Sequence, residues 1–134
     1  MKESKEVRAE RQAREEWQFV DVLRRAGNDV TPEVELPKPD GEGRPWRIDY
    51  VIRYGGPSPI AVEIQGWGFG HVGRTGWLRD IVKCQAIAAA GYRYVPMTRE
   101  HVANGDGLES LARAGVPVEP AAGGGGSFKS RSGA

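Results

Sequence analysis

The stretch Arg47-Ile48-Asp49-Tyr50-Val51 is followed by a Gly-Gly-Pro turn at residues 55–57 and then by Ala61-Val62-Glu63-Ile64-Gln65-Gly66. Both runs consist mainly of strand-forming residues, and each carries one acidic residue among apolar neighbours. Such a turn can join two antiparallel strands, so the sequence predicts that Asp49 and Glu63 lie side by side. Paired carboxylates surrounded by other oxygens are typical of a site for a hard cation such as Mg²⁺, which commonly serves phosphate chemistry.

At these residues the chain resembles the PD-(D/E)XK nuclease superfamily, in which an Asp on one strand and a (D/E)-x-K motif on the next hold the metal ions. Asp49 matches the first acid and Glu63-Ile64-Gln65 matches the second motif, with Gln65 in place of the lysine. Within the superfamily, the chain is most similar to archaeal-type Holliday junction resolvases, which phages also carry. Those enzymes begin with a helix whose metal-site Glu lies eleven residues before a terminating Gly, as Glu16 does before Gly27.

A second, overlapping likeness covers Glu63-Ile-Gln-Gly, then His71, Asp80 and Lys83, and then the run Ala-Ala-Gly-Tyr-Arg-Tyr-Val-Pro-Met-Thr at residues 89–98. This segment is similar to phage nucleases and mismatch-repair-type endonucleases of the same superfamily. Those enzymes place a His after the second carboxylate and a D-x-x-K or D-x-x-R motif on the following helix. Together the two likenesses extend between residues 10 and 104.

The resemblance implies a metal site for Mg²⁺, with Mn²⁺ as a substitute. Its ligands are expected to be Asp49, Glu63 and the backbone carbonyl of Ile64, with Glu16 joining from the first helix directly or through water. Glu15 is an alternative donor on that helix, and an ordinary exposed acid is the alternative interpretation of Glu16.

An unpaired carboxylate is costly to bury in an apolar strand, so Asp49 and Glu63 require a partner of some kind. A metal ion is one explanation. Salt bridges with Arg47 and Arg53 are the other, and in that case the carboxylates have only a structural role.

Because Gln65 carries no charge, the matching motif lacks its usual ammonium group. Some superfamily members supply that group from the next helix, and Lys83 does so if the helix packs across the two strands. Lys83 would then stabilise the transition-state charge, while Gln65 positions water or phosphate. A solvated Lys83 paired with Asp80 is the alternative. His71 is a candidate proton shuttle or phosphate contact, or else a surface histidine.

Contacts with DNA are expected from guanidinium groups, which bind phosphate in a bidentate manner, and from aromatic rings, which stack on bases at a branch point. Individually, such arginines are most often ordinary surface charges, and Trp77 is expected in the core. The candidate DNA-binding residues are Arg44, Arg47, Arg53, Arg74, Arg79, Trp67 and Phe69.

The length of 134 residues suits one nuclease domain, expected at residues 1–118, followed by a flexible Gly/Ser-rich tail at residues 119–134. Lys and Arg number 19 and Asp and Glu 18, so a DNA-binding surface must be a local patch. Cys84 is the only cysteine and cannot form an intrachain disulfide. With no apolar run of membrane length and no signal-peptide pattern, the protein is expected in the cytoplasm, that of the host cell if it is phage-encoded.

Residue patterns predict elements in the order α-β-β-β-α-β, followed by a short helix and a candidate second one. The helices are expected at residues 3–26, 76–90, 99–104 and 108–114, and the strands at 34–36, 46–54, 60–64 and 92–98. Val7, Ala13, Trp17, Val20 and Leu23 are expected to share one face of the first helix, whose almost wholly charged first turns, through Arg14, are expected to project from the core. Pro96 indicates a sheet edge or a strand end. This order fits an α/β (α+β) restriction-endonuclease-like core, a central mixed β-sheet flanked by helices.

The resemblance implies a structure-selective endodeoxyribonuclease that resolves four-way (Holliday) DNA junctions by paired symmetric incisions. The chain has no evident element for reading a DNA groove, which suits recognition of shape and backbone. The resembled enzymes act as C2 dimers, so a homodimer is expected, with no membrane and no small-molecule substrate. The alternatives are a phage endonuclease acting on mismatched, flapped or duplex DNA, and a DNA-binding module whose nuclease site has decayed.

Overall fold

The computed structural model describes residues 2–65 and 73–120, and the side chains of residues 73–79 lie outside that description. Its elements are α1 (Lys5–Arg25), β1 (Asp29–Leu36), β2 (Trp46–Arg53), β3 (Ile60–Gln65), α2 (Gly73–Ala89), β4 (Arg93–Thr98), α3 (Arg99–Asn104) and α4 (Asp106–Arg113). The order and types agree with the prediction. The main difference is that β1 begins at Asp29, because an edge strand tolerates the poor strand former Pro32.

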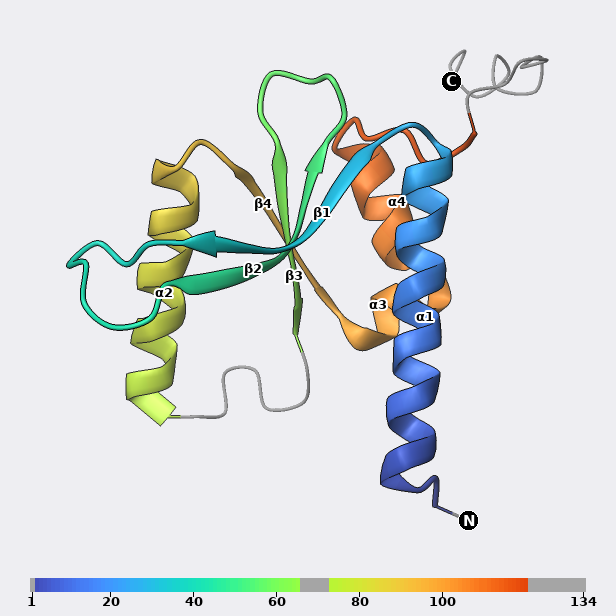
Figure 1. Ribbon diagram of the computed structural model, residues 1–134, viewed down its shortest axis with the longest axis horizontal. Helices are drawn as coiled ribbons and strands as arrows, with labels where there is room; N and C mark the ends of the chain where they lie inside the picture. The colour runs from blue at the N-terminus through green and yellow to red at the C-terminus, as the bar shows by residue number, and fades with distance from the viewer. Residues whose placement is uncertain (1, 66–72, 121–134) are drawn as a thin grey trace.

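The sheet has the order β1-β2-β3-β4, in which the first two pairings are antiparallel and the last is parallel. Helix α2 provides the crossover between the parallel strands β3 and β4. Figure 1 shows α2 on one face of the sheet and α1, α3 and α4 on the other. The predicted fold class, a mixed β-sheet flanked by helices, is therefore confirmed. Pro96 also lies as expected, because β4 is an edge strand of the described sheet.

Apolar side chains form one cluster on each face of the sheet. The cluster beneath α1, α3 and α4 includes Phe19, Leu23, Ile52, Ile60, Val62, Met97 and Leu111, and the cluster beneath α2 includes Leu36, Ile48, Val51, Ala61 and Ile87. Strand β3 contributes to both clusters, so its residues from Ile60 to Glu63 are buried without alternation. Glu63 is thus the last buried residue of β3.

The buried face of α1 differs from the predicted one. Val20 and Leu23 are buried, together with Phe19, but Trp17 is 66% exposed and Val7 is also exposed. The prediction is wrong for Trp17, because the side of the C-terminal half of α1 that packs on the core carries Phe19, Val20 and Leu23 instead. The first turns project beyond the sheet, as their charge predicts, and Val7 and Ala13 are exposed there (Figure 1). The side that faces the sheet instead carries Glu16 one turn before Val20.

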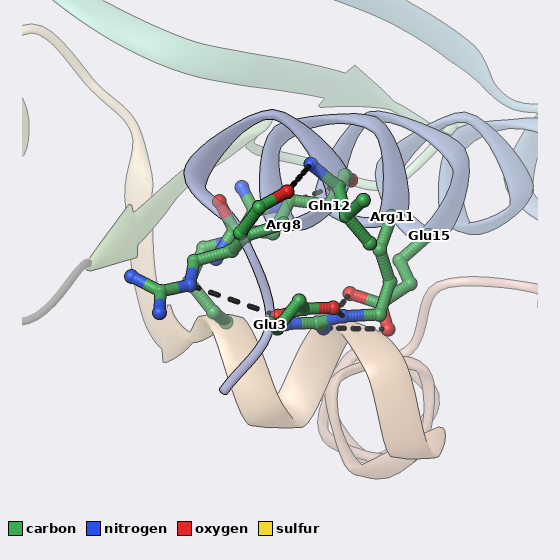
Figure 2. A network of polar contacts seen from close by, with 8 residues as sticks. Glu3, Arg8, Arg11, Gln12 and Glu15 are labelled. Carbon is green, nitrogen blue, oxygen red and sulfur yellow. Dashed lines mark hydrogen bonds and ion pairs between the residues drawn. The ribbon is translucent and has the colours of Figure 1, made fainter. Parts of the chain in front are cut away.

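The N-terminal half of α1 is organised by charged side chains (Figure 2). Arg11 donates from Nε and Nη2 to the carboxylate of Glu3 at 2.7 and 2.9 Å, and from Nη1 to Glu15 at 3.2 Å. The Arg11 hydrogen bonds lower the pKa of Glu3. Glu15 is therefore paired within its own helix.

Local signals fix two further helix ends. Gly27, with φ of +94°, follows the C-terminus of α1, as its sequence position predicts. The Thr98 side chain caps α3, and His101 completes a capping box there, which gives His101 a structural role.

In the described residues, no helix combines the length and apolar character that crossing a lipid bilayer requires.

Candidate active site

Asp49 and Glu63 meet across the antiparallel pair β2–β3. The register joins Tyr50 to Val62, so the next position along sets Asp49 opposite Glu63. The Glu63 Oε2 atom accepts the backbone N–H of Asp49 at 3.1 Å, and the Asp49 Oδ2 atom accepts the backbone N–H of Ile64 at 2.8 Å. The two acids lie together, as the hairpin predicts.

The backbone of β2 departs from regular pairing at Asp49. On one side, the pairing with β1 skips Glu33 and Asp49, and Glu33 has a φ of +50°, an uncommon value for a residue other than glycine. On the other side, the pairing with β3 ends at Tyr50. Carboxylate oxygens thus replace backbone carbonyls as hydrogen-bond acceptors at this end of the strands.

Arginine salt bridges do not explain the carboxylate pair. Arg47 forms an ion pair with Glu33 at 2.7 Å instead. Among the side chains that the structure describes, no arginine pairs with Asp49 or Glu63.

Lys83 reaches the carboxylate pair from α2. Its ammonium donates to Oε1 of Glu63 and to the backbone carbonyl of Arg47, the latter at 3.0 Å. Glu63 is only 6% exposed, so its charge needs such a partner. The helix therefore packs across the strands in the way that the catalytic interpretation of Lys83 requires, and Lys83 is not paired with Asp80.

Glu16 lies beside the carboxylate pair but has partners of its own. Its Oε1 atom accepts the hydroxyl of Tyr50, and its Oε2 atom accepts Nη1 of Arg99 at 2.7 Å. Arg99 also donates from Nη2 to the backbone carbonyl of Gln12 at 2.9 Å. Burial and the contact with Glu16 raise the pKa of Tyr50.

The electrostatics centre on Asp49. Burial raises the pKa of its carboxyl group, and the charges of Glu63 and Glu16 raise it further. The hydrogen bond from the Ile64 N–H and the charge of the Lys83 ammonium lower the pKa of Asp49. Three carboxylates and two cations, Lys83 and Arg99, leave one net negative charge in this region.

Gln65 follows Glu63 by two residues, at the end of β3. Burial raises the pKa of the Tyr94 phenol, and the neighbouring Cys84 and Glu63 raise it further, whereas Gln65 lowers it. Tyr94 therefore lies near Gln65 and Glu63 at this end of the sheet.

The candidate DNA-binding arginines are divided between the two ends of β2. Arg44 and Arg47 are exposed at the end that carries Asp49. Arg53 is exposed at the hairpin end, four residues and roughly 13 Å from Asp49 along the strand. The candidates Trp67, Phe69 and His71 lie outside the described residues, as do the side chains of Arg74, Arg79 and Trp77.

The sequence interpretation missed three residues around the acids: Tyr50, Tyr94 and Arg99. Tyr50 adjoins Asp49, a position from which contact with the site could have been inferred. Nothing local indicates that Arg99 meets Glu16, which is 83 residues away.

In the described residues, no group of three or more His, Cys, Asp or Glu side chains is arranged to hold a metal ion.

No protein-family model, curated protein or solved structure matches this chain. The class of protein is therefore defined by the fold and the site alone. It is an α+β protein with a carboxylate pair and a lysine at one end of a mixed sheet.

We expect replacement of Asp49 by asparagine to stabilise the metal-free protein at neutral pH. The folded state raises the pKa of Asp49, so the ionised carboxylate lowers the free energy of unfolding above that pKa, and the cost disappears as falling pH protonates it. Asparagine keeps an oxygen acceptor for the Ile64 N–H. Urea denaturation in EDTA should show a gain of about 1 kcal/mol at neutral pH that vanishes in acid.

The matched control is Asp29→Asn, an exposed position on the neighbouring strand β1. It should leave the free energy of unfolding unchanged at both pH values. If Asp49→Asn were less stable than the unsubstituted protein at neutral pH, the account of a destabilising Asp49 carboxylate would be wrong.

Proposed function

We propose that this chain is a metal-dependent endodeoxyribonuclease that resolves four-way DNA junctions, with a role in DNA recombination and repair. The observation that carries the proposal is the contact of Asp49, Glu63 and Lys83 at one end of the β2–β3 pair. Two acids and an ammonium group on neighbouring strands and a packed helix suit the hydrolysis of a phosphodiester bond.

The donor set fits a hard divalent cation such as Mg²⁺. Within the described residues, Oδ2 of Asp49 accepts one N–H and Oδ1 has no hydrogen-bond partner. The Glu63 oxygens each accept one hydrogen bond and keep a further lone pair. Asp49, Glu63 and the Ile64 carbonyl would hold the ion. When bound, it would polarise the scissile phosphate and lower the pKa of a water molecule.

The chain's own residues supply the other parts of the reaction. Lys83 is held by Glu63 and by the Arg47 carbonyl, so its charge is in place before the reaction begins. A preorganised ammonium stabilises the negative charge that accumulates on the phosphate oxygens. The Gln65 amide, two residues beyond Glu63 on β3, would position water or phosphate.

Junction resolution is favoured over other nuclease activities by the resemblance of α1 and by the compact fold. The acid of the first helix, Glu16, lies eleven residues before Gly27, as in the resembled resolvases, although its carboxylate is bonded to Tyr50 and Arg99 here. The described elements include none beyond the sheet and its covering helices that would read a DNA groove. Recognition would therefore rely on shape and on phosphate contacts from Arg44 and Arg47. Paired cuts in opposite strands require a C2 dimer.

The test is to incubate the protein and Mg²⁺ with a four-way junction and, separately, with a flap, a mismatched duplex and a linear duplex of the same arms. We expect paired symmetric incisions in the junction only, which EDTA abolishes and Mn²⁺ restores. Cleavage of the flap or duplex at equal rate would indicate a nuclease of other specificity. Junction binding without any cleavage would indicate a decayed site.

A further inference from the structure

Both carboxylate oxygens of Glu16 are engaged by strong donors. The Tyr50 hydroxyl donates a hydrogen bond to Oε1, and Nη1 of Arg99 donates to Oε2 at 2.7 Å. The resemblance to junction resolvases makes Glu16 a metal ligand, but here a cation already neutralises it. The side chains of Glu16 and Arg99 are 29% and 25% exposed, so water competes only in part for this pair.

Arg99 is fixed in this position by α1. Its Nη2 atom donates to the Gln12 carbonyl, one turn before Glu16. Its Nε atom is buried and has no hydrogen-bond partner in the described part of the chain. The guanidinium therefore depends on Glu16 and Gln12 for its bonds within the described chain, and turning away from Glu16 would give up a charge-assisted hydrogen bond.

The charges of the region limit how many ions it can take. With Lys83 on Glu63 and Arg99 on Glu16, one net negative charge remains. One divalent cation would reverse that charge to a single positive one, and a second would leave an excess of three positive charges. Electrostatics thus favour a single ion.

We propose that Arg99 and Tyr50 withhold Glu16 from the metal ion, so that Asp49 and Glu63 bind one divalent cation per chain. Arg99 is then a positioning residue that sets the metal stoichiometry. This inference rests on the proposed function, because it concerns the ion that the nuclease requires.

Mn²⁺ binding to the full chain, measured by calorimetry and by the electron paramagnetic resonance of free Mn²⁺, tests the inference without an activity assay. We expect one ion per chain, and a loss of affinity of about tenfold or more in Asp49→Asn. The decisive variant is the double substitution Glu16→Gln with Arg99→Gln, which removes the ion pair as a neutral unit. It should bind one Mn²⁺ with an affinity close to that of the unsubstituted protein.

Arg99→Gln alone frees the Glu16 carboxylate and removes a positive charge. It should bind Mn²⁺ several-fold more tightly or take up a second ion, whereas Arg99→Lys, which keeps the charge, should retain one. The matched control is Arg113→Gln, which breaks the exposed pair with Glu109 on α4 and should change nothing.

Each outcome decides between the alternatives. If the double variant loses as much affinity as Asp49→Asn, then Glu16 is a ligand, and the inference is wrong while the nuclease proposal stands. Binding of two ions per chain by the unsubstituted protein would also contradict the inference and leave the nuclease proposal standing. If the unsubstituted protein binds no Mn²⁺ at all, the proposed function itself is wrong. If circular dichroism shows that Arg99→Gln does not fold, the inference is still tested by the double variant and by Tyr50→Phe. Tyr50→Phe should also bind Mn²⁺ more tightly.

Discussion

Asp49→Asn is expected to reduce the rate of junction cleavage by about a thousandfold, because loss of a metal-binding carboxylate removes several kcal/mol of transition-state stabilisation. The affinity for the uncleaved junction should stay unchanged or rise, since one negative charge near the phosphates is lost. Single-turnover cleavage and a gel-shift titration in Ca²⁺ measure the two effects separately.

The same variant is expected to be more stable than the unsubstituted protein, and this combination is informative. A side chain that lowers stability and raises activity is typical of a catalytic site, whereas a structural carboxylate raises stability. Asp29→Asn, on the exposed side of β1, should cleave at the normal rate. If Asp49→Asn cleaves normally, the carboxylate pair has no catalytic role and the mechanism proposed for it is wrong.

The meeting of Asp49 and Glu63 could be predicted because it depends on short-range information. A hairpin sets the register of its two strands, and the register decides which side chains lie opposite each other. The contact of Lys83 with Glu63 depends on the crossover helix α2 packing on the sheet, which the fold class requires.

The surroundings of Glu16 could not be predicted in the same way. The spacing to Gly27 located Glu16 on the first helix, but its partner Arg99 begins α3, far away in sequence. The same long-range packing decided the exposure of Trp17. Periodicity gives the relative faces of a helix, but which face becomes buried depends on how the helix is rotated against the sheet, and here the buried side carries Phe19, Val20 and Leu23.

Lys83→Gln is expected to reduce cleavage by about a hundredfold or more, because a preorganised charge at the transition state is lost. Metal binding should not weaken, since the removed group is a cation rather than a ligand. The buried Glu63 loses its partner, so the free energy of unfolding should also fall, by about 2 kcal/mol. Circular dichroism of the folded variant accompanies the cleavage assay.

A second substitution separates catalysis from this loss of stability. Gln65 lies two residues beyond Glu63 on β3, so its side chain is on the same face of the sheet. In Lys83→Gln with Gln65→Lys, the ammonium is moved from α2 to the strand position that the superfamily motif uses. If Lys83 supplies the missing charge, this double variant should cleave at least about tenfold faster than Lys83→Gln. A tenfold difference in rate corresponds to about 1.4 kcal/mol in the barrier.

Lys5→Gln, at the exposed start of α1, is the matched control and should cleave normally. Recovery of folding stability without recovery of cleavage would mean that Lys83 only neutralises Glu63. Recovery of both would mean that the charge itself is needed, because the two lysine positions share only their closeness to Glu63. An ammonium group from α2 and one from β3 would then be equivalent beside the two acids.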